Sequence, residues 1–269
     1  MAIHPADSDA IYIGTDVGGS YRYNHLTEEW ELVTNGLSQQ NRGYDANQAI
    51  ALDPKDPDVV YMALGNKSGG EGVIVKNGIL RSFDRGNTWT DINVTGTITA
   101  DNTKPLQSLM SVDPNNGNVL YAVCPYEGLY RTRNVRDKVP VWEKLNIPGF
   151  TAASDLKNIM SGVAIDGSET ESGMSKTIYV STRTGGVYRS DDCGTSFTLL
   201  EESPKTVTMM QTNKSGELYV NADFQDGGIL KYDGKNWSSV SPFKDRGYCS
   251  FAINPNDEKV IAAAAKTDL

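Results

Sequence analysis

One aspartate near the start of the chain has a setting suited to catalysis. Asp16 lies in the stretch Gly14–Arg22, GTDVGGSYR, between a threonine and a run of small residues that includes a Gly-Gly pair. A carboxylate that water can reach is able to take up a proton, which is the task of a general base. Aspartate also bonds the backbone of ordinary turns, so Asp16 alone does not decide between the two roles.

Aromatic and acidic residues gather in several segments that we expect to be loops. A sugar ring needs an apolar surface to stack on and polar groups to bond its hydroxyls, so such segments suit a carbohydrate site. The alternative is that the aromatic side chains only pack the loops. The segments are Tyr44 with Asp45, Tyr126 with Glu127, Phe224 with Asp223 and Asp226, and Phe243 and Tyr248 with Asp245.

Composition excludes several classes of function. The chain has 269 residues and a net charge of −9, which argues against nucleic acid as a partner because phosphate binding needs clustered Lys and Arg. No apolar run reaches the ~20 residues of a membrane span, and the opening residues lack the pattern of a secretory signal. Cys124, Cys193 and Cys249 form no CxxC pair and the two histidines have no metal-ligand spacing, so we expect neither metal nor cofactor.

The chain is built from an internal repeat. The signature Gly-x-(Tyr/Leu)-(Arg/Lys) recurs five times, and each copy follows a strand-like run that mostly comes after an (Asp/Asn)-Pro turn. A bulky aromatic follows each copy and is expected to pack between sheets. Each repeat therefore predicts four strands, which is one blade of a β-propeller. The signatures begin at Gly19, Gly78, Gly128, Gly186 and Gly228, and the aromatics are Trp30, Trp89, Trp142, Phe197 and Trp237.

Two of the turns carry a fuller motif. The stretches SFDRGNTW (82–89) and SDDCGTSF (190–197) both follow Ser-x-Asp-x-Gly-x-(Ser/Thr)-aromatic, the Asp-box. Its glycine tolerates positive φ, and its Asp and Ser/Thr side chains bond the turn itself, so Asp84 and Asp192 are expected to make the fold rather than do chemistry. We predict an all-β propeller of five full blades and a partial sixth, with residues 1–269 as one domain and as part of a longer chain.

The repeat also separates Asp16 from these turns. In a four-stranded up-and-down blade, the Asp-boxes and the Asp-Pro turns lie on one face, and the loop with Asp16 lies on the opposite face. The same position in the other repeats holds Val75, Pro125, Arg183 and Gln225. Asp16 is thus outside the repeat consensus, which favours a functional role over a structural one.

Four stretches carry a resemblance to a known family: GTDVGGSYRYN, AIALDPKDPDVVYMALG, GILRSFDRGNTW and GELYVNADFQDGGILKYDGKNWSSVSP. In these the chain resembles glycoside hydrolase family 74, the xyloglucanases and oligoxyloglucan reducing-end-specific cellobiohydrolases. The resemblance implies two seven-bladed propellers facing each other across an open cleft, and inverting hydrolysis of a xylose-decorated β-1,4-glucan. It implies that Asp16 is the general base and that the general acid lies in a second propeller, outside this chain.

The expected partner is therefore a plant cell-wall polysaccharide, xyloglucan or a related β-glucan, with no nucleic acid and no membrane. The full-length protein is expected to be extracellular, because this substrate cannot cross a membrane. We expect substrate contacts from Gly18, Gly19, Tyr44, Asn66, Tyr126, Phe224 and Tyr248.

Two other functions are weighed against this one. Because no general acid can be assigned in the chain, it could be a non-catalytic Asp-box propeller that binds glycan or protein. A sialidase needs an arginine triad and an early (Phe/Tyr)-Arg-Ile-Pro motif, which is absent. The arginines Arg22, Arg81, Arg131 and Arg189 all stand in the repeat signature and are interpreted as structural residues at the blade edges.

Overall fold

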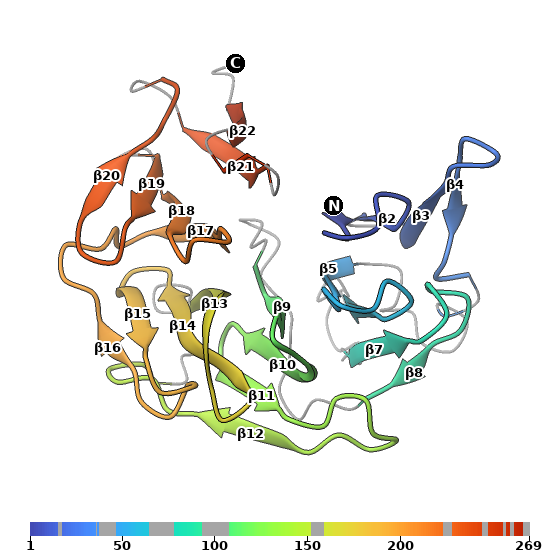
Figure 1. Ribbon diagram of the computed structural model, residues 1–269, viewed down its shortest axis with the longest axis horizontal. Helices are drawn as coiled ribbons and strands as arrows, with labels where there is room; N and C mark the ends of the chain where they lie inside the picture. The colour runs from blue at the N-terminus through green and yellow to red at the C-terminus, as the bar shows by residue number, and fades with distance from the viewer. Residues whose placement is uncertain are drawn as a thin grey trace, which may run out of the picture.

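The chain forms a fan of β-sheets. The computed structural model describes residues 1–15, 18–35, 37, 47–64, 78–92, 108–151, 159–222, 228–243, 247–254, 257–258 and 261–265. Its strands form five four-stranded sheets and one two-stranded sheet, arranged in an arc around a common centre (Figure 1). This confirms the all-β propeller with five blades and a partial sixth. In the described part of the chain, no helix has the length and apolar character to cross a membrane.

Each full blade has four strands in chain order. Blade 1 has β1 (Ala2–Ile3), β2 (Ile11–Gly14), β3 (Ser20–Asn24) and β4 (Glu29–Leu32), and blade 2 has β5 (Asn47–Leu52), β6 (Val60–Leu64), β7 (Gly78–Ser82) and β8 (Thr90–Asp91). Blade 3 has β9 (Met110–Asp113), β10 (Asn116–Cys124), β11 (Gly128–Thr132) and β12 (Trp142–Leu145). Blade 4 has β13 (Met160–Glu171), β14 (Met174–Thr182), β15 (Gly186–Ser190) and β16 (Thr198–Leu199). Blade 5 has β17 (Val207–Thr212), β18 (Leu218–Ala222), β19 (Ile229–Tyr232) and β20 (Trp237–Ser239), and the partial blade 6 has β21 (Tyr248–Ile253) and β22 (Ile261–Ala265).

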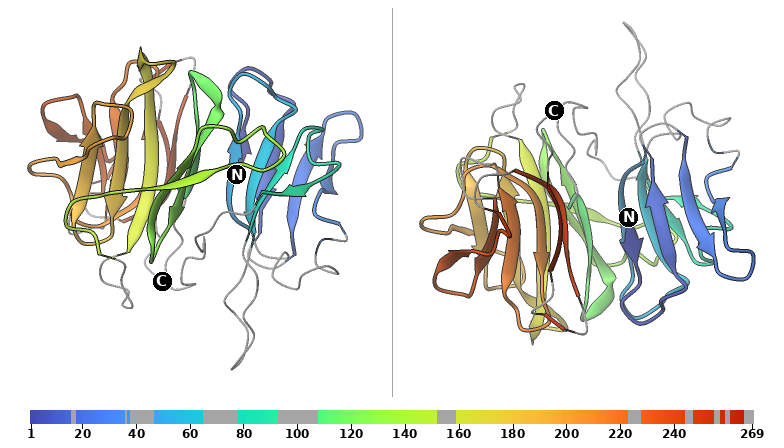
Figure 2. Two further views of the ribbon diagram at one scale, coloured as in Figure 1. Left: turned by 90° about the horizontal axis from the view of Figure 1, so that it is seen from below. Right: turned by 90° about the horizontal axis from the view of Figure 1, so that it is seen from above.

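In blades 2 to 5 the second strand is largely buried between neighbouring blades, whereas in β2 of blade 1 Tyr12 is the buried residue. Every side chain of β6 is buried, and so are the last six of β10. These strands are rich in Val, Tyr, Ile and Ala, the composition expected of a strand without a solvent face. The two side views show the sheets standing beside one another, with their strands running between two loop-bearing faces (Figure 2).

The core is a series of apolar layers between blades. One large cluster joins blades 2, 3 and 4, and smaller clusters lie between blades 1 and 2, 4 and 5, and 5 and 6. Full burial of one Leu or Ile side chain stabilises a fold by roughly 1.5–3 kcal/mol. The sheets are therefore held to each other mainly by these layers, and each blade is fixed by the one that follows it.

The repeat aromatics fasten one blade to the next, as expected. Trp89 donates its indole N–H to the carbonyl oxygen of Val33 in blade 1 at 2.8 Å, and Trp142 donates to Ile92 of blade 2 at 3.2 Å. Phe197 is buried in the main cluster. Trp30 is the exception at 43% exposed, and its ring lies 5.2 Å from that of Tyr23 in its own blade.

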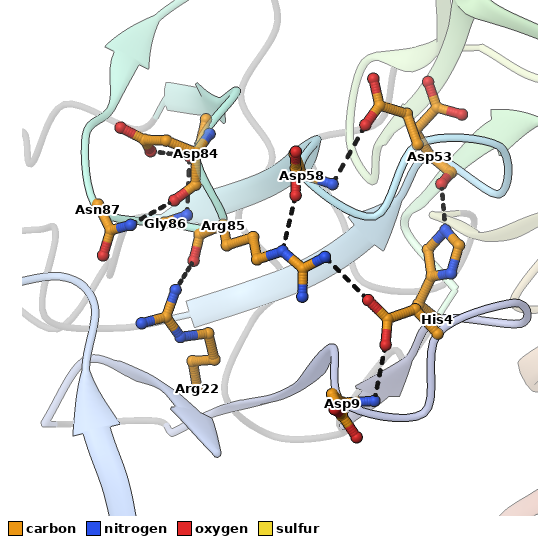
Figure 3. A network of polar contacts seen from close by, with 12 residues as sticks. His4, Asp9, Arg22, Asp53, Asp58, Asp84, Arg85, Gly86 and Asn87 are labelled. Carbon is orange, nitrogen blue, oxygen red and sulfur yellow. Dashed lines mark hydrogen bonds and ion pairs between the residues drawn. The ribbon is translucent and has the colours of Figure 1, made fainter. Parts of the chain in front are cut away.

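The two faces of the blades are separated as the sequence predicts. Arg85 of the blade 2 Asp-box forms ion pairs with Asp58, in the turn between β5 and β6, at 2.6 Å and with Asp7, in the turn before β2, at 2.9 Å. Figure 3 shows the Asp58 contact beside the Asp-box. Thr15 follows the other end of β2, so the loop from 15 to 19 lies at the opposite face.

Candidate functional site

The loop that joins β2 to β3 is closed by its two ends. The backbone N–H and the hydroxyl of Thr15 both donate to the carbonyl oxygen of Gly19, at 3.1 and 2.8 Å. Gly18 and Gly19 have φ angles of +131° and +88°, which side-chain-bearing residues rarely adopt. The Gly-Gly pair is thus required by the turn, and Asp16 lies within the turn by sequence.

Thr34 holds the second end of this loop from its own blade. The backbone N–H of Ser20 donates to the Thr34 hydroxyl at 3.0 Å, and both residues are buried. A Cβ atom on Gly19 would lie 2.3 Å from the same hydroxyl oxygen. The hydroxyl therefore fits against residue 19 only because that residue is glycine.

Asn47, the first residue of β5, holds both ends of the loop from the neighbouring blade. Its backbone N–H donates to the carbonyl oxygen of Thr15 at 3.0 Å, and its side-chain amide donates to the Ser20 hydroxyl at 2.8 Å. A Cβ atom on Gly14 would lie 2.4 Å from Cγ of Asn47. The Asn47 side chain thus occupies the space that a side chain at residue 14 would fill.

The structure describes four of the predicted site residues and leaves the other four outside the described ranges. Gly18 and Gly19 shape the turn just described. The other residues that the structure describes are Tyr126 and Tyr248, whereas Asp16, Tyr44, Asn66 and Phe224 lie outside the described residues. The predictions for these four remain predictions.

Tyr126 and Tyr248 are both held by the fold. Tyr126, in the turn between β10 and β11, is half-buried and packs against the main core cluster. Tyr248 begins β21 with 3% of its surface exposed, accepts a hydrogen bond from the backbone N–H of Phe243 at 2.7 Å, and donates one to its carbonyl oxygen at 2.9 Å. These contacts fit the packing alternative for Tyr248, and its role as a sugar contact stays a prediction.

The Asp-box carboxylates accept hydrogen bonds from their own turns, as predicted. Asp84 accepts hydrogen bonds from the Ser82 hydroxyl and from both the N–H and the hydroxyl of Thr88, at 2.6–2.8 Å. Asp192 accepts the equivalent bonds from Ser190 and Ser196. Desolvation opposes the charge of Asp192, but these bonds outweigh it and lower its pKa from 3.8 to about 2. Each carboxylate is a structural acceptor held in its ionised form.

Three of the four signature arginines tie their blade to the Asp-box position of the next blade, and the fourth, Arg189, pairs with Asp191 of its own blade at 2.8 Å. Arg22 donates to the carbonyl oxygen of Arg85 at 3.0 Å (Figure 3). Arg81 and Arg131 donate to the same position in the following blades, the carbonyl oxygens of Val135 and Cys193. The contacts between blades confirm that Arg22, Arg81 and Arg131 are structural and leave none of these three to bind a substrate carboxylate.

Sequence reasoning did not find Thr34 and Asn47, and it did not recognise Ser20 as part of the site. The signal for Ser20 was present, because its position in the repeat signature holds Ile, Leu or Val in the other blades. No group of three His, Cys, Asp or Glu residues suited to a metal ion occurs in the part of the chain that the structure describes.

The chain is similar to xyloglucanases over nearly its whole length. It is 27% identical to a Paenibacillus xyloglucanase over 98% of this chain and 28% of that protein, and 27% identical to a xyloglucanase of Acetivibrio thermocellus over 91% of this chain and 30% of that protein. It is also 27% identical to a Hypocrea jecorina xyloglucanase over 90% of this chain and 32% of that protein. The chain therefore spans about a third of the length of the curated relatives it matches. No protein-family model matches it.

Solved structures agree with the sequence comparison. A family 74 glycoside hydrolase of Niastella koreensis superposes with a TM-score of 0.84 at 26% identity, over 97% of this chain and 40% of that one. The family 74 xyloglucanase of Xanthomonas campestris gives a TM-score of 0.83 at 24% identity, over 98% of this chain and 41% of that one, which shows the same fold. The chain is a homologue of family 74 xyloglucanases and matches a propeller portion of them.

Proposed function

We propose that this chain is part of a xyloglucan-active β-1,4-glucan hydrolase and contributes its general base, Asp16. The observation that carries the proposal is the similarity to xyloglucanases across nearly the whole chain, which includes the loop from 15 to 19. Two features of the described residues support it. The loop lies on the face away from the Asp-boxes, and it is held by Thr15, Thr34 and Asn47.

The proposed reaction is a single displacement with inversion. Ionised Asp16 takes a proton from a water molecule, and the oxygen of that water attacks the anomeric carbon of a glucosyl unit. The bond from this carbon to the leaving sugar oxygen breaks, and that oxygen receives a proton from a general acid. The two carboxyl groups of an inverting enzyme stand roughly 6.5–9.5 Å apart, which leaves room for the water.

We further propose that the general acid belongs to a second propeller of the full-length protein, so that residues 1–269 are part of its first propeller. Gly18 and Gly19 would let a sugar approach the backbone beside Asp16, and Tyr44, Asn66, Tyr126, Phe224 and Tyr248 are the proposed substrate contacts. A protein that acts on cell-wall polysaccharide must reach it outside the cell, so we propose that the full-length protein is secreted.

The test uses the full-length gene product and xyloglucan. Reducing ends are assayed for the wild type, for Asp16→Asn and for the fold-control variant Asp192→Asn, and proton NMR identifies the first anomer released. We expect the α-anomer from the wild type, because a β-linkage is inverted. Removal of a general base should lower kcat about 10²- to 10⁴-fold, whereas Asp192→Asn should leave kcat within about two-fold of the wild type.

Two outcomes would contradict the proposal. Release of the β-anomer would exclude inversion. Binding of xyloglucan without any release of reducing ends by the wild type would favour the non-catalytic glycan-binding propeller.

A further inference from the structure

Blade 1 departs from the repeat beneath the loop that carries Asp16. The blades can be aligned by the pairing between the tyrosine of the second strand and the basic residue of the third, such as Tyr12 with Arg22 and Tyr179 with Arg189. In this register Ser20 occupies the position that the other full blades fill with Ile79, Leu129, Val187 and Ile229. All five side chains are fully buried, so blade 1 buries a hydroxyl where the other four bury an aliphatic group.

Asn47 is the residue that bonds the buried Ser20 hydroxyl, and it also departs from the repeat. It pairs with Leu64 just before a register shift in β5, and Met160 and Val207 begin their inner strands in the same way. Met160 and Val207 are fully buried and apolar. The polar side chain at this position therefore occurs where the inner strand adjoins Ser20, and its amide bonds the Ser20 hydroxyl at 2.8 Å.

Gly14 is the third residue of this group that departs from the repeat, after Ser20 and Asn47. Its position is occupied by Ala63, Val123, Ser181 and Asn221 in the other full blades. The Asn47 side chain lies where a Cβ on residue 14 would be, so Asn47 fits only against glycine. The three departures from the repeat are thus mutually dependent.

Docking of the neighbouring blade does not require this polar set. Between blades 3 and 4, the backbone N–H of Met160 donates to the carbonyl oxygen of Pro125 at 2.8 Å, whereas that of Asn47 donates to Thr15, one repeat position earlier. A backbone bond from the inner strand to the preceding blade is therefore also made between blades 3 and 4, there by a residue with an apolar side chain. Burying the Ser20 hydroxyl costs free energy unless it is hydrogen-bonded, and the half-buried Asn47 amide supplies such a bond. The Ser20–Asn47 pair therefore adds a constraint that packing alone does not need.

We infer that Ser20 and Asn47 are positioning residues for Asp16, an inference that rests on the proposed function. Asn47 bonds Thr15 and Ser20, one on each side of the turn, and so fixes its two ends to blade 2. Neither residue needs to touch the reacting atoms. Small displacements of a catalytic group cost as much as ~10²-fold in rate, so an anchor at the two ends of the loop would bear directly on the rate of a base that the loop carries.

The test compares Asn47→Ala with a matched control in the full-length gene product. The control is Ser161→Ala, which breaks another buried pair, Ser161 with Ser181, at the same 2.8 Å in blade 4. We expect Asn47→Ala to lower kcat on xyloglucan about 10- to 100-fold with KM within two-fold. The acidic limb of its pH profile should also move, because that limb reports the general base. Ser161→Ala should leave kcat and the pH profile unchanged.

A second variant separates positioning from folding. Ser20→Val with Asn47→Ala removes both polar partners and restores the apolar pattern of the other blades. We expect it to keep the thermal midpoint of unfolding close to that of the wild type and to show the same loss of kcat as Asn47→Ala. A folded double variant with the kcat of the wild type would overturn the inference.

The remaining outcomes distinguish this inference from the proposed function. If Asp16→Asn abolishes activity while Asn47→Ala keeps kcat within two-fold, the positioning role is wrong and the general base stands. If Asn47→Ala raises KM without changing kcat, Asn47 is a substrate contact, and the positioning role is again wrong. If Asp16→Asn keeps full activity, the proposed function fails, and this inference fails with it.

Discussion

The loop between β2 and β3 and the Asp-box between β15 and β16 both contain an aspartate and a glycine, but the closing bonds that the structure describes come from different groups. In the Asp-box, the Asp192 carboxylate accepts the bonds that close the turn, from Ser190 and Ser196. In the loop from 15 to 19, the closing bonds are made by Thr15, Thr34 and Asn47.

Under the proposed function, this difference lets one repeat serve both fold and catalysis. A carboxylate that closes its own turn has its acceptor positions occupied and a lowered pKa, so it makes a poor base. In the loop from 15 to 19, hydroxyls and backbone groups of the described residues make the closing bonds. The face with the Asp-boxes is thus built by repetition, and under the proposed function the opposite face gains its chemistry where blade 1 departs from the repeat.

The largest expected effect separates two glycines that share one local structure. Gly19 and Gly186 have φ angles of +88° and +97°, and a Cβ on either would lie 2.3 or 2.6 Å from a hydroxyl oxygen, of Thr34 or Ser203. Substitution by alanine should therefore lower the free energy of unfolding of both by about 1–3 kcal/mol. Chemical denaturation of Gly19→Ala and Gly186→Ala in the full-length protein measures this.

The two variants, Gly19→Ala and Gly186→Ala, should differ in kcat on xyloglucan. Gly19→Ala distorts the loop with Asp16 and should lower kcat on xyloglucan more than about 10-fold, whereas Gly186→Ala should leave the kcat of the folded enzyme nearly unchanged. Equal losses of kcat in the two variants would remove the distinction between the loop and the other blades.

A smaller effect is expected from pH at the Asp-box. The pKa of Asp192 is lowered to about 2, so the stability that its ionised form contributes is fully present above about pH 4 and is lost as the pH falls through about 2. Asp192→Asn should cost about 1 kcal/mol at neutral pH through weakened hydrogen bonds, and the dependence of its stability on pH between 4 and 2 should be flatter. Denaturation midpoints of wild type and variant across this range test the prediction, and identical slopes would contradict it.

Most of the fold could be predicted from the sequence because each blade repeats the same local rules. The (Asp/Asn)-Pro turns, the strands centred on tyrosine and the two Asp-boxes are short-range patterns, and so they gave the strands, the blades and the roles of Asp84 and Asp192. The separation of the two faces followed from strand order alone. Arg85 and Asp58 meet on the predicted face.

The anchoring of the loop could not be predicted in the same way. Asn47 lies in the next blade. Its contact with Ser20 depends on a register shift in β5, and no local sequence pattern predicts that shift. Tyr248 was assigned to a loop, but it begins β21, in a register position like that of Met160 and Val207, and it is buried. Contacts between blades depend on three-dimensional register, whereas turns depend on neighbouring residues.

The most direct test of the central claim is chemical rescue of Asp16→Ala with sodium azide in the full-length gene product. Azide is already an anion, so it can attack the anomeric carbon without a base, while the general acid still protonates the leaving sugar. We predict that the variant loses hydrolysis of xyloglucan, regains turnover when azide is added and releases an α-glycosyl azide, and that Asp192→Ala forms none. Hydrolysis by Asp16→Ala at the rate of the wild type, or loss of hydrolysis without any glycosyl azide, would contradict a general base at Asp16.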